Sequence, residues 1–161
     1  MLFRSPAAKI VFEKTGDKAF LKRAYPQIVR FHQWLKRVRD AADTGLVAIV
    51  HPWESGMDNS PSFDGVKDHF LKHHLPPGFE PPPRADTKRV PPEQRPTQDY
   101  YQFYWGLIRI FRETGWNPRE MVKRSPCLID DVLFNSIWAR ANDDLATLAW
   151  EIGRASCRER V

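Results

Sequence analysis

The sequence is poor in cysteine and in long apolar runs. It contains two cysteines among its 161 residues, and Cys157 belongs to a C-terminal tail that is treated separately below. Cys127 cannot form an internal disulfide without a second cysteine. This is compatible with a reducing compartment, and we expect a cytoplasmic location. No stretch approaches the ~18 apolar residues of a membrane-spanning helix, and residues 1–6 lack the long apolar core of a signal peptide. We therefore expect neither a membrane anchor nor secretion.

The signatures of several enzyme classes are missing as well. There is no glycine-rich phosphate loop, no set of Ser or Cys with His and an acid, no useful strand alternation and no internal repeat. His69 and His73, spaced i,i+4, could bind one metal with Asp68 and His74 nearby, but no glutamate in the metalloprotease position and no cysteine accompany them. We interpret them as a solvated helix face, and we expect no metal and no organic cofactor.

The last ten residues, from Ile152 to Val161, read as a translated sequencing adapter. The codons ATC GGA AGA GCG TCG TGT AGG GAA AGA GTG encode them in order; the alternative is a natural basic tail. We treat residues 154–161 as an artefact. Without their three arginines and one glutamate, the formal net charge falls from +5 to +3. The basic charge is therefore weak evidence for a nucleic-acid partner. Residues 1–153 are expected to be a fragment, because the reading frame then runs off a contig.

Apolar residues recur at spacings of three and four in three stretches, which is the pattern of amphipathic helices. The stretches are 20–42, 101–111 and 134–148. Asp17 is expected to cap the first of these helices, and Asp130 or Asp131 the last. Shorter helical segments are expected from Ser5–Pro6 to Phe12 and around Met121–Val122.

Glycine and proline indicate where helices bend or end. Pro26 predicts a kink or a restart in the helix over 20–42, and Gly45 predicts its end. Residues 75–97 hold eight of the fourteen prolines, a density that excludes a helix and predicts an extended excursion. The expected fold class is therefore all-α with one long proline-rich loop.

The segment from His51 to Asp64 has no core-like periodicity and carries the clearest chemistry. Gly56 and Pro61 prevent a regular helix through it and favour a fixed irregular loop. Carboxylates and amides hydrogen-bond hydroxyl groups, and an aromatic face can stack on the C–H face of a sugar, so such a loop suits a polyhydroxylated substrate. A capped turn is the alternative interpretation. The loop contains Trp53, Glu54, Ser55, Gly56, Asp58 and Asn59.

The sequence Gly45-Leu46-Val47, followed by the run from His51 to Pro61, resembles the catalytic-acid loop of glycoside hydrolase family 63. The relatives of that family include mannosylglycerate and glucosylglycerate hydrolases and, more distantly, trehalases. The shared pattern is Glu-Ser-Gly-hydrophobic-Asp, which places Asp58 at the position of the general acid. The resemblance covers most of residues 17–151, unevenly. It extends to the segments 84–86, 95–101, 130–135 and 139–142.

The resemblance implies an all-α fold that is part of an α/α toroid, in which six helical hairpins surround a central pocket. Such a ring needs about 300 residues or more, so this chain would form only part of it. The implied reaction is hydrolysis of an α-glucosidic or α-mannosidic bond with inversion, and Asp58 protonates the leaving oxygen. In the family that this sequence resembles, the catalytic base is a glutamate far downstream, which the resemblance places beyond the end of this sequence, so the fragment itself is expected to be inactive.

The same resemblance assigns roles to the other polar residues. Glu54 would bind substrate or raise the pKa of Asp58 through its like charge. Arg84 and Asp86 would support the site or contact the substrate, and Arg84 with Arg95 could bind the carboxylate of a glycerate group. An oligosaccharide with a terminal α-glucose is the alternative substrate. The further expected substrate-binding residues of the loop are Trp53, Ser55, Gly56 and Asn59.

A non-catalytic helical module that binds nucleic acid or a protein partner is the alternative function. Residues 100–105 are rich in aromatic side chains that could stack on bases, but their spacing favours a core helix, with Tyr100 and Phe103 partly exposed. Such a module should tolerate loss of Asp58 and bind nucleic acid in a salt-dependent way. We expect a small carbohydrate as the partner, with no nucleic acid and no membrane; the sequence leaves the oligomeric state open.

Overall fold

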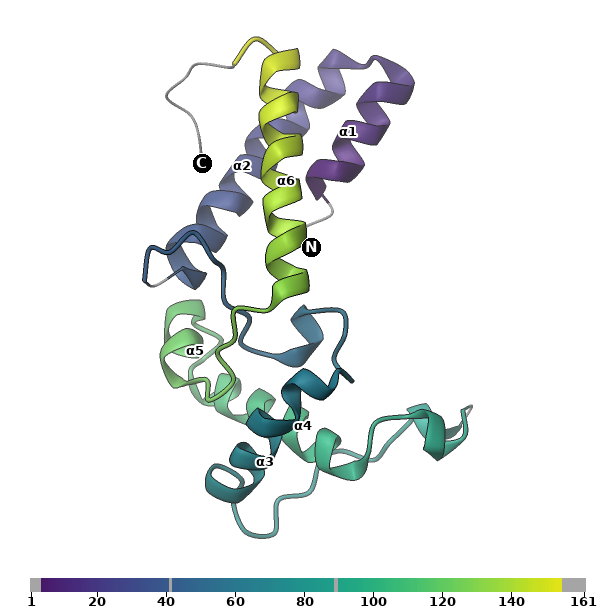
Figure 1. Ribbon diagram of the computed structural model, residues 1–161, viewed down its shortest axis with the longest axis vertical. Coiled ribbons are helices and arrows are strands. Elements are labelled where there is room, and N and C mark those ends of the chain that lie inside the picture. Colours follow the sequence, from purple (N-terminus) through teal and green to yellow (C-terminus); the bar gives the residue numbers. More distant parts are fainter. Residues whose placement is uncertain (1–3, 41, 89, 155–161) are drawn as a thin grey trace. The chain divides into compact units, whose positions relative to one another are not determined.

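Figure 1 shows the computed structural model, which describes residues 4–40, 42–88 and 90–154. These residues form six α-helices, and their β structure is one isolated antiparallel bridge between Ile49 and Ile129. No helix in the described part is long and apolar enough to cross a membrane. The expected all-α class is confirmed. The helices are α1 Arg4–Thr15, α2 Lys18–Arg39, α3 Asp64–His73, α4 Gln98–Glu113, α5 Pro118–Arg124 and α6 Val132–Glu151.

The chain divides into two compact units. We call the residues up to 48 and from 130 onward the helical unit, and residues 49–129 the loop unit. The helical unit contains α1, α2 and α6, and the loop unit contains α3, α4, α5 and the irregular segments between them. The expected adapter tail lies outside the described residues, apart from Arg154.

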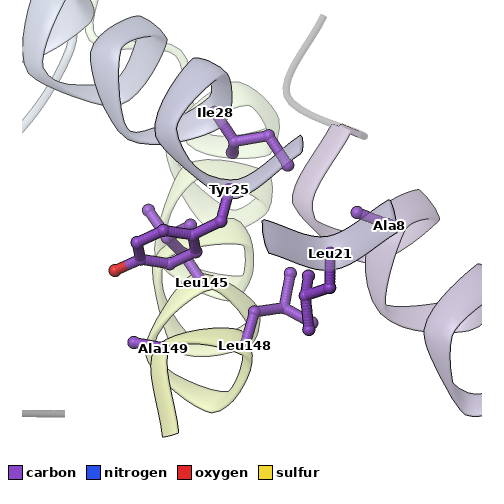
Figure 2. Packing of buried hydrophobic residues seen from close by; sticks show 7 residues of the cluster. All are labelled: Ala8, Leu21, Tyr25, Ile28, Leu145, Leu148 and Ala149. Atoms are coloured by element: carbon purple, nitrogen blue, oxygen red, sulfur yellow. The ribbon is translucent and has the colours of Figure 1, made fainter. Parts of the chain in front are cut away.

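The helical unit is built on apolar contacts among three helices, as Figure 2 shows. Leu21 and Leu148, on α2 and α6, are completely buried in this core. The carboxylate of Asp17 accepts a hydrogen bond from the backbone N–H of Phe20 at 2.8 Å, and that of Asp131 accepts one from Phe134 at 2.7 Å. Both predicted caps are confirmed. The cluster consists of Ala8, Leu21, Tyr25, Ile28, Leu145, Leu148 and Ala149.

The course of α2 agrees in part with the prediction. The helix continues through Pro26, which excludes a restart there, and the alternative of a kink stays a prediction. Packing of Tyr25 and Ile28 in the core offsets the backbone hydrogen bond that proline cannot donate. The helix ends at Arg39, earlier than the pattern suggested, and the carboxylate of Asp40 then accepts bonds from the N–H groups of Thr44 and Gly45 at 2.8 and 2.9 Å. This side chain stabilises the turn that replaces the last expected helical turn.

A buried polar network also connects the three helices of the helical unit. Nδ1 of His32 lies 2.6 Å from Oδ1 of Asn142, and Nε2 lies 3.0 Å from the hydroxyl of Ser5. Because an amide oxygen can only accept, Nδ1 carries the proton and Nε2 accepts from Ser5. Burial lowers the pKa of His32, which favours the neutral ring that this arrangement needs. The network therefore joins α1, α2 and α6 without a buried charge on the histidine.

The loop unit is organised around α4, one face of which is covered by α3. The ring of Phe70 on α3 contacts Phe103, with 5.3 Å between centroids, and a Cβ atom on Gly106 would lie 2.5 Å from the same ring. Phe103 and Tyr100, which we expected to be partly exposed, have exposed fractions of 0% and 9%. That expectation was wrong because α3 packs on this face of α4. The buried residues of α4 are Tyr100, Phe103, Tyr104, Gly106, Leu107, Ile110 and Phe111.

The described residues of the proline-rich segment 75–97 form no α-helix, as its composition predicted. Its regular structure is confined, in the residues described, to the 3₁₀ turns η3 Asp86–Lys88 and η4 Pro92–Gln94. Residues 47–50, which lead into the acid loop, are buried, and the bridge to Ile129 holds Ile49 within the loop unit. The hydroxyl of Ser125 donates a further bond to the carbonyl of Val50 at 3.0 Å. The loop that follows therefore begins from a fixed point.

Candidate active site

The loop from His51 to Asp64 consists of two 3₁₀ turns, η1 Pro52–Glu54 and η2 Pro61–Phe63, joined by irregular residues. His51 is buried at its start. Nε2 lies 3.1 Å from the carbonyl oxygen of Tyr104 and donates to it, while Nδ1 accepts from the N–H of Trp53 at 3.1 Å. Burial lowers the pKa of His51 to about 4. The ring is therefore neutral near pH 7 and ties the start of the loop to α4.

Glu54 and Ser55 make their described contacts inside the loop. The carboxylate of Glu54 accepts from the N–H of Val50 at 2.8 Å. The buried hydroxyl of Ser55 donates to the carbonyl of Pro52 at 2.7 Å and accepts from the N–H of Met57 at 2.9 Å. Gly56 then takes a positive φ of 73°, which a side chain would strain. These contacts shape the loop, and the expected contacts of Glu54, Ser55 and Gly56 with substrate stay predictions.

Asp58 is half-buried and lies where the loop meets α4. Its backbone carbonyl accepts a hydrogen bond from the hydroxyl of Tyr104 at 2.8 Å, and Oδ1 of Asn59 lies 3.3 Å from the same hydroxyl. Burial, and secondarily the negative charge of Asp58, raises the pKa of Tyr104. The phenol therefore stays protonated and can donate. The structure brings Asp58 and Asn59 together on one hydroxyl group of α4.

Tyr104 is a residue that the sequence interpretation assigned only to the core. Its exposed fraction is 1%, so a phenylalanine would satisfy the packing equally well. A tyrosine at a core position indicates that its hydroxyl has a partner, and this signal was available in the sequence. The identity of the partner was not, because Tyr104 is 46 positions from Asp58 in the chain.

An aromatic surface lies next to this contact. The side chain of Trp53 has an exposed fraction of 47%. Its ring centroid lies 4.4 Å from that of His51, 5.5 Å from that of Tyr104 and 6.2 Å from that of Trp105. The exposed indole is therefore fixed in place by other rings. Its position suits stacking against an apolar sugar face.

Arg84 and Asp86 form an ion pair, joined by Arg95. Nη2 of Arg84 and Nε of Arg95 each lie 2.9 Å from Oδ2 of Asp86. The hydrogen bond from Arg84, assisted by Arg95 and Tyr101, holds the pKa of Asp86 well below its usual range. The guanidinium of Arg84 also lies 3.9 Å from the ring centroid of Tyr101, whose ring is 6.2 Å from that of Tyr104. Tyr101 thus connects this cluster to the tyrosine that contacts Asp58.

His69 and His73 lie exposed on α3, as the solvated-face interpretation predicted. Their ring centroids are 4.6 Å apart, and that of His74 is 5.6 Å from His69. Among the residues that the structure describes, no group of three or more His, Cys, Asp or Glu side chains could hold a metal ion.

Comparison with known proteins places the chain in a family. The family model described as the mannosylglycerate hydrolase MGH1-like glycoside hydrolase domain matches residues 5–160. A mannosylglycerate hydrolase of Thermus thermophilus is 41% identical over 145 residues, which are 88% of this chain and 34% of that protein. The glucosylglycerate hydrolase of Mycolicibacterium hassiacum is 30% identical over 138 residues, which are 85% and 30% of the two chains.

The crystal structure of the GH63 mannosylglycerate hydrolase from another strain of Thermus thermophilus, in complex with Tris and D-glycerate, superposes with a TM-score of 0.85 at 38% identity. The superposition covers 94% of this chain and 37% of the other. The fold is therefore that of the α/α toroid glycoside hydrolases, as the resemblance implied. More particularly, the chain belongs to the mannosylglycerate hydrolase MGH1-like glycoside hydrolase family. This membership does not favour the alternative of a non-catalytic binding module.

The chain spans about a third of the length of these curated relatives. The assignment of residues 154–161 to an adapter stays a prediction.

Proposed function

We propose that this chain is the segment of an inverting α-glycosidase that carries the general acid, and that Asp58 is this acid. The observation that carries the proposal is the placement of Asp58, half-buried on a loop that is fixed to α4 by Tyr104, the residue whose ring also contacts the exposed ring of Trp53. Family membership supplies the reaction class.

In the proposed reaction, the protonated carboxyl of Asp58 donates its proton to the glycosidic oxygen while the bond between that oxygen and the anomeric carbon breaks. A second carboxylate removes a proton from a water molecule, whose oxygen bonds to the anomeric carbon from the opposite face. In inverting enzymes the two carboxyl groups stand roughly 6.5–9.5 Å apart. We place this base outside residues 1–153, in the part of the relatives that the chain does not match.

For the substrate, we propose a small α-glycoside with an anionic aglycone, such as mannosylglycerate or glucosylglycerate, on which the named relatives act. Arg84 and Arg95 share the single carboxylate of Asp86. One positive charge of the cluster is therefore left for an anionic group, and charged hydrogen bonds to a carboxylate are the stronger kind. A neutral oligosaccharide with a terminal α-glucose is the alternative. A cytoplasmic location belongs to the same proposal, because Cys127 is a buried free thiol.

The test of the acid uses a hybrid enzyme in which residues 5–153 replace the matching third of the Thermus thermophilus mannosylglycerate hydrolase. Asp58→Asn should lower kcat on mannosylglycerate by about 10²–10⁴-fold, because the amide cannot donate the catalytic proton. Asp68→Asn, at an exposed carboxylate of α3, is the matched control and should leave kcat unchanged. Near-normal turnover by Asp58→Asn, or an inactive hybrid that melts as cooperatively as its parent, would contradict the proposal.

The substrate is tested on the same hybrid with mannosylglycerate, glucosylglycerate, trehalose, nigerose and kojibiose. Arg95→Gln should raise KM for the two glycerate compounds by about tenfold, the equivalent of one charged hydrogen bond, and should change KM for the neutral disaccharides much less. Equal effects on charged and neutral substrates would reject the anionic aglycone and leave the general-acid proposal standing.

A further inference from the structure

Four loop residues around Asp58 are fixed by contacts that do not involve Asp58 itself. His51 binds α4, Glu54 and Ser55 bind the backbone of the loop, and the hydroxyl of Ser60 accepts from the N–H of Ser62 at 3.3 Å. Between these points, Met57 is exposed and Gly56 is in the left-handed region. Among the bonds described, the hydrogen bond from Tyr104 is what joins residue 58 to α4.

The hydroxyl of Tyr104 has little freedom to point elsewhere. Its ring is almost fully buried and contacts the rings of His51 and Tyr100, whose centroids are 5.7 and 5.6 Å away. A phenol has one proton to donate. The hydroxyl donates this proton to the carbonyl of Asp58, which is the closer partner at 2.8 Å; Oδ1 of Asn59 is 3.3 Å away.

We propose that Tyr104 is the positioning residue of the general acid: its buried hydroxyl fixes the backbone of Asp58 on α4 and so directs the carboxyl group toward the glycosidic oxygen. The inference rests on the proposed function. A carboxyl group is joined to its backbone through two rotatable bonds, so the position of the Asp58 carbonyl limits where the acid can lie. Displacement of a catalytic group by 1 Å can cost about 10²-fold in rate.

Tyr100 offers a matched control on the same helix, one turn earlier. Its hydroxyl donates to Oδ1 of Asp64 at 2.7 Å and lies 3.4 Å from the carbonyl of Ser60. It therefore holds the same loop at Ser60 and Asp64, which follow the acid by two and six positions. A phenylalanine at either position removes one oxygen atom and keeps the ring. The two variants loosen one loop at two places, and one of these places bears Asp58.

The experiment compares two substrates in the hybrid enzyme. One is mannosylglycerate, whose alkoxide leaving group needs protonation; the other is an aryl α-mannoside whose phenol is acidic enough to leave without it. Tyr104→Phe should lower kcat about 10- to 100-fold on mannosylglycerate and less than about threefold on the aryl glycoside. KM should stay within about twofold. Tyr100→Phe should change both rates by the same factor, as a merely structural contact would.

Equal losses on both substrates for Tyr104→Phe, or no loss, would overturn the inference. Asp58→Asn is measured on the same two substrates, so that a failure of the positioning role can be told apart from a failure of the proposed function. If Asp58→Asn shows no greater loss on mannosylglycerate than on the aryl glycoside, the general-acid assignment fails. If Asp58→Asn shows the difference and Tyr104→Phe does not, only the positioning role fails.

A second replacement covers the case in which Tyr104→Phe does not fold. 4-Fluorophenylalanine at position 104 fills the volume of the hydroxyl but has no proton to donate, whereas monofluorinated tyrosine keeps the donor. The 4-fluorophenylalanine variant should lower kcat about 10- to 100-fold on mannosylglycerate and less than about threefold on the aryl glycoside. The fluorotyrosine variant should keep the parent's ratio of the two rates. Equal losses on both substrates for 4-fluorophenylalanine would also overturn the inference.

Discussion

Different kinds of contact stabilise the interior of the helical unit and the acid loop of the loop unit. In the helical unit, apolar side chains of α1, α2 and α6 pack together, and one neutral histidine network joins the same helices. In the loop unit, the acid loop is held by single hydrogen bonds between polar side chains and backbone groups, and α4 provides several of them. Packing energy is spread over many atoms, whereas a single hydrogen bond fixes the position of one group.

The difference suggests how each unit responds to mutation. Loss of a buried side chain in the helical unit should cost stability. Loss of a hydroxyl in the loop unit should cost catalytic geometry while the fold persists, because a net hydrogen bond contributes only about 1 kcal/mol. Three predictions test this contrast, from the largest expected effect to the smallest.

The isolated 161-residue chain should show no measurable glycosidase activity and should self-associate. Under our proposal its loop unit lacks the catalytic base, and the helical unit exposes Val132 and Trp150 with fractions of 81% and 75%. Exposed apolar side chains of this size favour association. Activity assays and light scattering check both parts. A monodisperse, cooperatively melting chain that cleaves an α-glycoside would show that the proposed division of the site is wrong.

Leu148→Ala should destabilise the chain by about 2–5 kcal/mol, because it opens a cavity in the core between α6 and α2. Chemical unfolding at low protein concentration, followed by circular dichroism, measures the loss. Trp150→Ser on the same helix is the control. It removes an exposed ring, so it should leave the unfolding free energy nearly unchanged and reduce self-association. A loss under about 1 kcal/mol for Leu148→Ala would refute the packing described for the helical unit.

Acid should weaken the loop unit through His51. The folded pKa of about 4 lies below the ordinary histidine value of 6.5, so the unfolded chain binds the proton more readily. The contribution of neutral His51 is complete above pH 6.5 and is lost as the pH falls toward 4, by about 3 kcal/mol at the lower end.

Hydrogen exchange of residues 51–64 between pH 7 and 4, corrected for intrinsic rates, measures this loss in the loop unit, whereas His32 belongs to the helical unit. His51→Gln keeps a hydrogen-bond donor and cannot titrate. In this variant, the protection of residues 51–64 against hydrogen exchange should depend much less on pH. Identical pH dependence in the two proteins would exclude His51 as the cause.

Much of the local structure was predictable because it depends on neighbouring residues. The caps at Asp17 and Asp131 follow from short polar side chains placed before an apolar helical pattern. The irregular acid loop follows from Gly56 and Pro61, and the absence of α-helix among the described residues of 75–97 follows from the prolines there. Within α2, local rules left a kink or a restart open at Pro26, and packing of adjacent side chains maintained a continuous helix.

The sequence by itself determined most of the helical stretches and where the chemistry-bearing loop lies, and it predicts Asp58 as the general acid. Only the tertiary structure decided what those residues touch. The contacts of His51 and Asp58 with Tyr104 join positions 53 and 46 residues apart, and α3 determined that Phe103 is buried. The physical reason is that helical periodicity specifies the face on which a side chain lies, whereas its hydrogen-bond partner depends on which distant segment packs against that face.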